Sequence, residues 1–140
     1  MITLSQYAGV HAVNDDWKAH PERINNAKEL LKRVNALLDD LTQQRIYILT
    51  NNPKTGSQIS GEIFGGFRPQ SCPIGAPDSS HKQGQGVDIF DHDNALDNFL
   101  DNHPEYLAQY DLYRERAKDT PTWCHLQTRK TLSGKRTFIP

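Results

Sequence analysis

Two histidines and one aspartate have the types and spacing of metal ligands. His81 lies in the polar, glycine-rich run SSHKQGQGVD, Asp88 closes that run, and His125 follows 37 residues later (125 − 88) in TPTWCHLQT. A catalytic zinc ion takes three protein ligands and keeps a fourth position for water, and two imidazoles with one carboxylate are a suitable set. Spacing alone leaves a second interpretation open, because the chain has six histidines and each could be an ordinary surface or core residue.

The first two candidate ligands surround the start of a predicted strand. The segment GVDIF, residues 86–90, has the β-branched composition of a short strand, and Asp88 lies within it. His81 precedes this strand in a loop, where Gly84 and Gly86 tolerate tight backbone geometry. We therefore expect the loop to fold back and bring the imidazole close to the carboxylate.

The third candidate ligand lies on a second predicted strand, TWCHLQT, residues 122–128. Side chains alternate along a strand, so Trp123, His125 and Gln127 should share one face. Cys124 should then lie on the opposite face, in the core. The 37-residue separation of Asp88 from His125 leaves room for two helices and a return to a neighbouring strand.

A long helix is the clearest element of the remaining chain. Residues 21–41 carry an apolar stripe with the helical period, and Pro21 suits a first helical turn. The stripe is expected to be core and consists of Ile24, Ala27, Leu30, Leu31, Val34, Leu37, Leu38 and Leu41.

The other segments complete one α+β domain, residues 1–140, with a small, mostly antiparallel sheet flanked by helices. Turn-rich composition from 70 to 85 predicts a long loop. Extended segments or strands are predicted over 45–50, 62–69 and 135–140, and helices over 94–102 and 104–117.

Composition excludes several function classes. The net charge is −1 and no run of lysine or arginine stands out, which argues against a nucleic-acid partner. No stretch is long and apolar enough to span a membrane, and the N-terminus lacks the features of a secretory signal, so synthesis in the cytoplasm is expected. Cys72 and Cys124 are predicted to be free thiols, and a monomer is expected.

The run SSHKQGQGVD resembles a motif of the zinc D-Ala-D-Ala carboxypeptidases and their relatives. That family includes dipeptidases and phage endolysin peptidases of the hedgehog/DD-peptidase fold, and its motif reads Ser-x-His-x-x-Gly-x-Ala-x-Asp. Ser79, His81, Gly84 and Asp88 match it, while Gly86 stands at the alanine position. The resemblance is closest to short members of phage and prophage genomes.

Two further segments are similar to motifs of the same family. TWCHLQ looks like the Trp-x-His strand that supplies its third ligand, here His125, and FGGFRP looks like its Ser-Gly-Tyr-Arg segment, with Arg68 at the arginine position. The resemblance implies a hedgehog/DD-peptidase-like fold and a zinc ion held by His81, Asp88 and His125. Strict motifs cover only 65–88 and 122–128.

The resemblance also implies roles for the neighbouring residues. Arg68 could bind a substrate carboxylate or a developing oxyanion, or could form an ion pair that fixes the long loop. Ser79 is a candidate substrate contact, although it could instead bond a ligand or the loop backbone. Trp123 and Gln127 are candidate substrate contacts on the face of His125.

The general base is the least conventional part of the pattern. Many family members carry an acid three residues before the last histidine, and this chain has Thr122 there, which cannot take up a proton in the same way. The nearest upstream acids are Glu115 and Asp119. We favour Glu115, and expect a helix end to bring it to the metal.

The resemblance implies a zinc-dependent peptidase that cuts a peptide bond in bacterial cell-wall stem peptides. Such a protein would reach the wall through phage lysis machinery or as part of a virion. Thr122 supports an alternative, a catalytically inactive zinc module that binds the wall or serves in a phage particle. A third hypothesis is a cytoplasmic protein whose metal is structural.

Overall fold

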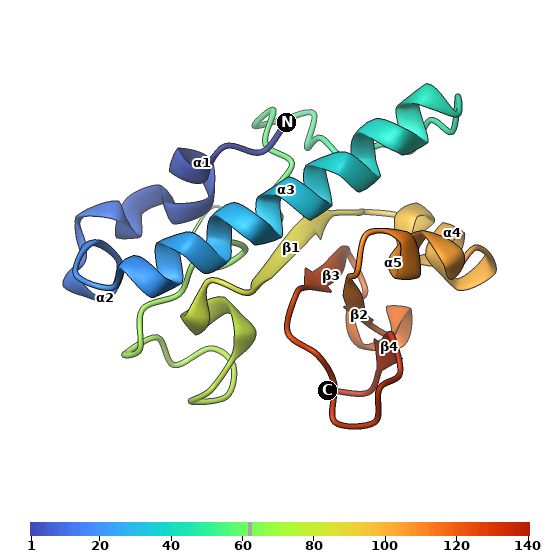
Figure 1. Ribbon diagram of the computed structural model, residues 1–140. Helices are drawn as coiled ribbons and strands as arrows, with labels where there is room; N and C mark the ends of the chain where they lie inside the picture. The colour runs from blue at the N-terminus through green and yellow to red at the C-terminus, as the bar shows by residue number, and fades with distance from the viewer. Residues whose placement is uncertain (62) are drawn as a thin grey trace.

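The computed structural model describes residues 1–61 and 63–140. It contains a four-stranded sheet in the order β1-β3-β2-β4. Strand β3 pairs antiparallel with both β1 and β2, whereas β2 and β4 are parallel. The predicted α+β class with a small, mostly antiparallel sheet is therefore confirmed (Figure 1). The strands are β1 (Gly86–Phe90), β2 (Tyr113–Glu115), β3 (Trp123–Gln127) and β4 (Thr137–Phe138).

Helices flank this sheet, with the long helix α3 running past β1 (Figure 1). None of the helices in the described ranges combines the length and the apolar character that crossing a bilayer requires. The α-helices are α1 (Leu4–Ala8), α2 (Asp15–Lys18), α3 (Pro21–Gln43), α4 (Ala95–Asn102) and α5 (Glu105–Gln109), and the short 3-10 helices are η1 (Gly9–Val13), η2 (Ser80–Gln83) and η3 (Ala117–Asp119).

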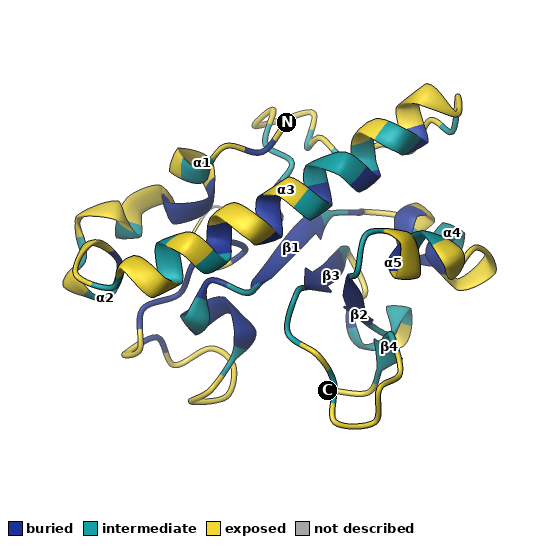
Figure 2. Ribbon diagram, viewed as in Figure 1, coloured by how far each residue is buried: buried dark blue, intermediate teal, exposed yellow. Residues whose placement is uncertain are grey.

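Helix α3 forms where the apolar stripe predicts it and begins at Pro21, in the first turn. Its buried side faces the sheet and its opposite side is exposed (Figure 2). Ile24 and Leu38 pack at the border of the core. The buried members of the stripe are Ala27, Leu30, Leu31, Val34, Leu37 and Leu41.

Alternation along β1 and β3 separates a core face from a polar face. The register pairs Val87 with Leu126 and Ile89 with Cys124, and all four residues are fully buried. The other face therefore carries Asp88 and its neighbours. Cys72 and Cys124 are both free thiols, and Cys124 lies in the core, as predicted from the sequence; Cys72 is buried as well.

Two predicted elements differ from the structure. The described residues show no strand over 45–50, because this segment has no partner strand to pair with. Ile46 and Ile48 still pack against the core. The helix predicted over 104–117 is wrong beyond Gln109. Asp111 adopts a positive φ of 50° and reverses the chain, which allows the following residues to enter the sheet as β2.

The segment predicted as extended over 62–69 contributes little regular pairing. A bridge joins Ile59 to Ile89, and Asp88 donates its backbone N–H to the Gly65 carbonyl at 2.8 Å. The segment therefore lies along the free edge of β1. Glu62 is outside the described residues.

A buried ion pair ties β2 to α4. Arg114 is fully buried, and its Nη1 donates to Asp97 Oδ1 at 2.7 Å, while Nη2 contacts the carboxylate of Asp101. Thr120 and Asn94 also donate to Asp97 Oδ2, at 2.9 and 3.1 Å. Since β2 has only three residues, this network contributes to its placement beside β3.

Candidate metal centre

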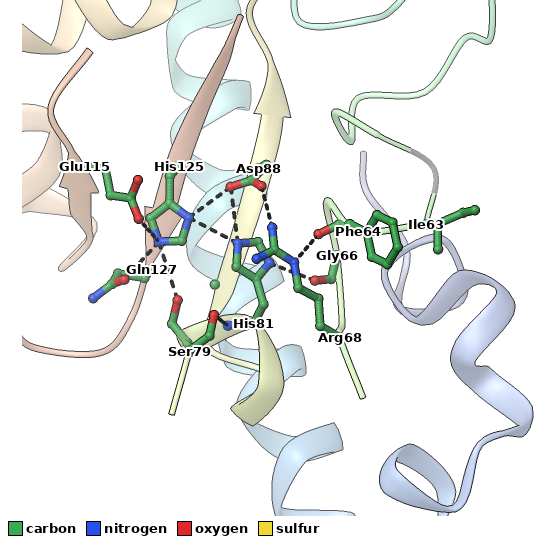
Figure 3. Close-up of polar contacts among 12 residues, drawn as sticks. Ile63, Phe64, Gly66, Arg68, Ser79, His81, Asp88, Glu115, His125 and Gln127 are labelled. Carbon is green, nitrogen blue, oxygen red and sulfur yellow. Dashed lines mark hydrogen bonds and ion pairs between the residues drawn. The ribbon is translucent and has the colours of Figure 1, made fainter. Parts of the chain in front are cut away.

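His81, Asp88 and His125 meet in one buried cluster, as predicted (Figure 3). The Oδ1 atom of Asp88 lies 2.9 Å from His125 Nδ1 and 3.2 Å from His81 Nε2, and these two ring nitrogens lie 3.2 Å apart. All three side chains are at most one-tenth exposed. This group could hold a metal ion.

The cluster follows directly from strand register and loop geometry. Asp88 and His125 are opposite one another in the β1–β3 ladder, so their side chains project from the same face of the sheet. His81 comes from η2, which ends at Gly84 in a left-handed conformation with φ of 73°. Glycine accommodates that conformation without a side-chain penalty, and the chain can then enter β1 at once.

Hydrogen bonds on the outer side of each ring fix which nitrogen faces the centre. His81 Nδ1 lies 2.8 Å from the carbonyl oxygen of Gly66, which can only accept, so Nδ1 carries the proton. His125 Nε2 lies 2.9 Å from Gln127 Oε1, which also only accepts. The unprotonated nitrogens, Nε2 of His81 and Nδ1 of His125, therefore point toward Asp88.

This arrangement fits a metal ion. Three acceptor atoms face one another at 2.9 to 3.2 Å, and they repel unless a cation lies among them. Ligands of a tetrahedral zinc ion at about 2.1 Å lie about 3.4 Å from each other, close to the observed separations. A single proton can satisfy one pair at a time, whereas a metal ion satisfies all three atoms.

Electrostatics favour the charged carboxylate. Burial alone would raise the pKa of Asp88, but in the metal-free site, when the imidazoles are protonated, the charge of His81 and hydrogen bonds from His125 and His81 hold that pKa well below its usual range. Burial alone would lower the pKa of His125, yet the hydrogen bond that its protonated, metal-free ring donates to Asp88 raises that pKa overall. Asp88 is thus an anion at neutral pH and available as a ligand.

Arg68 holds the outer oxygen of the same carboxylate. Its Nη2 donates to Asp88 Oδ2 at 3.1 Å, and its Nε donates to the Phe64 carbonyl at 2.6 Å. The ion pair considered from the sequence is therefore present, although its partner is a candidate ligand rather than the loop. Within the described residues, Nη1 has no hydrogen-bond partner and lies beside Gly75 at the groove.

Glu115 reaches the site, but from a strand and not from a helix end. Alternation along β2 puts Arg114 in the core and Glu115 on the polar face, and Glu115 Oε1 lies 4.0 Å from His125 Nε2. Burial raises the pKa of Glu115, and the Asp88 charge adds to this while His125 opposes it. Asp119 instead pairs with Arg116 at 2.6 Å, and Thr122 is exposed.

A groove of about 790 Å³ opens over the cluster. Its volume lies in the range of small-molecule binding sites. Ser79 lines it, although its hydroxyl also caps η2 by accepting the His81 N–H at 3.3 Å. The predicted site residues that line the groove are Arg68, Ser79, His81, Asp88, Glu115, Trp123, His125 and Gln127.

Three contributors to the centre are not indicated by the motifs. The Gly66 carbonyl orients His81, and Ser80 Oγ lies 3.4 Å from His125 Nε2. The buried Tyr7 hydroxyl donates to the Gly86 carbonyl at 2.9 Å, which fixes the start of β1. Backbone carbonyls have no residue-type signature, so the sequence offers no signal for the first of these contacts.

The glycine at position 86 has a steric explanation. A Cβ atom at Gly86 would lie 2.3 Å from Ser80 Oγ and 3.0 Å from His125 Cε1. Ser80 therefore occupies the space that an alanine methyl group would need, and it lies directly against a candidate ligand.

Gly86→Ala should weaken zinc binding about 10- to 100-fold, because the added methyl group displaces the His125 ring. Ser80→Gly in the same chain should restore most of the affinity, since it removes the clashing atoms. Competition with a chromogenic zinc chelator measures both effects, with Ser80→Gly alone as the control. If Gly86→Ala bound zinc as tightly as the wild-type protein, the site would tolerate the added methyl group and the steric explanation would be wrong.

These elements define a small α+β domain with a buried His-Asp-His group that could hold a metal ion. Comparison with protein-family models, with curated proteins and with solved structures gives no match to this chain. Its function must therefore be inferred from the groove itself and from the motifs that form it.

Proposed function

We propose that the chain is a zinc-dependent peptidase that hydrolyses a peptide bond in bacterial cell-wall stem peptides, with a hedgehog/DD-peptidase-like fold. The observation that carries this proposal is the convergence of the His81, Asp88 and His125 ligand atoms in a groove that also contains Glu115. Zinc at such a site lowers the pKa of a bound water to about 7 and polarises a carbonyl group. The two histidines and Asp88 would hold the ion.

Glu115 is the proposed general base. Its carboxylate lies beside His125 on the groove wall, and a raised pKa suits a group that takes up a proton during the reaction and releases it afterwards. Such a group must be within hydrogen-bond reach of the attacking water. The half-buried position of Glu115 allows it to approach a bound substrate from β2.

Arg68 and the groove walls would position the substrate. Two of the three guanidinium nitrogens of Arg68 hold Phe64 and Asp88, and Nη1 is left to bind a free carboxylate or the developing oxyanion. Trp123 offers an apolar surface on the same wall as His125. Stem peptides carry free carboxylates, which suits a groove with this cation.

An inactive zinc module is the second candidate, and Thr122 favours it. The side chain at the position of the family's usual acid is exposed and cannot serve as a base. The protein would then bind the wall or serve as part of a phage particle. Access to the wall through lysis machinery or a virion belongs to both proposals.

Cleavage assays distinguish these functions. Zinc-loaded protein incubated with peptidoglycan should release new amino and carboxyl groups, whereas Glu115→Gln should lose at least about 100-fold in rate while still binding zinc and wall. Asp119→Asn is the matched control, since that carboxylate pairs with Arg116, and it should cleave normally. Zinc-loaded wild-type protein that binds the wall and releases nothing would favour the inactive module.

A further inference from the structure

We infer that Gln127 is a positioning residue that selects the tautomer of His125 and so turns one ring nitrogen toward the metal. This inference rests on the metal centre of the proposed function and assigns Gln127 a role other than substrate contact. The residue is only 6% exposed, although it lines the groove.

The orientation of the Gln127 amide is set by a backbone group. Its Nε2 donates to the carbonyl oxygen of Arg129 at 2.8 Å. A carbonyl oxygen has no proton to donate, so the amide nitrogen must face Arg129 and the amide oxygen must face the other way. The oxygen then lies 2.9 Å from His125 Nε2.

The amide oxygen in turn decides the protonation of the ring. Since Oε1 can only accept, His125 Nε2 must carry a proton, and a neutral imidazole then has its lone pair on Nδ1. That nitrogen lies 2.9 Å from Asp88 Oδ1 and 3.2 Å from His81 Nε2. The carbonyl group of Arg129 therefore sets the tautomer of His125 through the Gln127 side chain.

The Arg129 carbonyl is itself held in place. The Arg129 guanidinium donates from Nε to Gln85 Oε1 at 3.1 Å and also contacts the carbonyl oxygen of Asp78, another residue that lines the groove. The neighbouring Thr128 donates its N–H to the Gln85 carbonyl at 3.0 Å. These contacts fix the end of β3, so the acceptor that orients Gln127 cannot easily turn away.

Two other polar groups lie near the same nitrogen, and neither makes the selection. Glu115 Oε1 is 4.0 Å from His125 Nε2, beyond hydrogen-bond distance, and the second group is the Ser80 hydroxyl. This hydroxyl lies 3.4 Å from His125 Nε2, farther than the Gln127 oxygen. A hydroxyl can donate or accept, so it is compatible with either tautomer. Both polar atoms of the Gln127 amide are engaged within the chain, which leaves this side chain poorly suited to bind substrate.

Zinc affinity in a set of variants tests the inference. Gln127→Met keeps the side-chain volume and removes the acceptor, and should weaken zinc binding about 10- to 100-fold. Gln127→Glu keeps an acceptor for the Nε2 proton and should stay closer to wild type than Gln127→Met. Gln109→Met makes the same substitution at an exposed glutamine and should bind zinc as the wild-type protein does.

The tautomer in the wild-type protein is an independent measurement. Long-range nitrogen–proton correlation spectra of zinc-loaded protein should show the His125 proton on Nε2. A proton on Nδ1, or wild-type zinc affinity in a folded Gln127→Met variant, would overturn the inference. A changed KM with unchanged zinc affinity would make Gln127 a substrate contact, which also overturns it.

These outcomes separate the inference from the proposed function. Zinc binding that depends on Gln127 in a protein that cleaves nothing would support the inference and reject the peptidase. Cleavage with unaltered zinc affinity in Gln127→Met would do the reverse. A wild-type protein that binds no zinc would reject both.

Discussion

His125→Ala should abolish stoichiometric zinc binding. We expect the purified wild-type protein to hold about one zinc ion per chain, and the variant to bind zinc at least about 1,000-fold more weakly, because one of three protein ligands is missing. The side chain is buried within the cluster, and among the described residues His81 is the only other histidine in the group. Elemental analysis after gel filtration, followed by chelator competition, measures the loss.

His92→Ala is the matched control, because it removes an exposed histidine outside the groove and should leave zinc content unchanged. Thermal unfolding adds a second measurement. Free zinc at 1,000 times its dissociation constant stabilises the folded state by about 4 kcal/mol, so chelation should lower the unfolding temperature of the wild type but not of His125→Ala. A full complement of zinc in His125→Ala would disprove the proposed ligand set.

Asp97→Ala should be strongly destabilising, by about 3–5 kcal/mol in the free energy of unfolding. The substitution leaves the Arg114 guanidinium buried without its fully buried counter-ion and also removes the acceptor for Thr120 and Asn94. Asp101 remains as a partner, but its side chain is about half exposed, so it offsets only part of the loss. Urea titration monitored by tryptophan fluorescence gives the change.

Asp93→Ala provides the comparison for this effect, since it removes an exposed aspartate of the same region. It should change stability by no more than about 0.5 kcal/mol. The double variant Asp97→Leu with Arg114→Met should be more stable than Asp97→Ala alone, because no buried charge is left unpaired. If Asp97→Ala were as stable as Asp93→Ala, the buried pair would have no role in holding β2.

Periodic segments of the chain are predictable, and segments controlled by distant contacts are not. Helix α3 and strands β1 and β3 repeat their apolar residues with the period of their secondary structure, so sequence alone places them. Residues 110–117 continue a helix-like pattern after α5. The positive φ of Asp111 and the burial of Arg114 against Asp97 override that local preference.

In the candidate site, too, some residues are predictable from the sequence and others are not. His81, Asp88 and His125 are found from motifs, because a metal needs particular side chains at particular places on adjacent elements. The prediction that Glu115 lies near the metal ligands is correct, but the prediction that a helix end carries it is wrong. Glu115 lies on β2, which is too short to show a strand pattern in the sequence. The role of Gln127 depends on the backbone carbonyl of Arg129, and no pattern of residue types reports such a contact.

Because Asp88 and His125 are paired across two strands, metal binding at this site depends on the register in which β1 and β3 pair. If β1 and β3 paired one residue out of register, Asp88 would face Cys124 or Leu126, and one of the two ligands would turn toward the core. Such a misaligned chain could not chelate the ion. A bound metal ion would therefore stabilise only molecules in which β1 and β3 pair in the correct register, and would favour them over misaligned forms during folding.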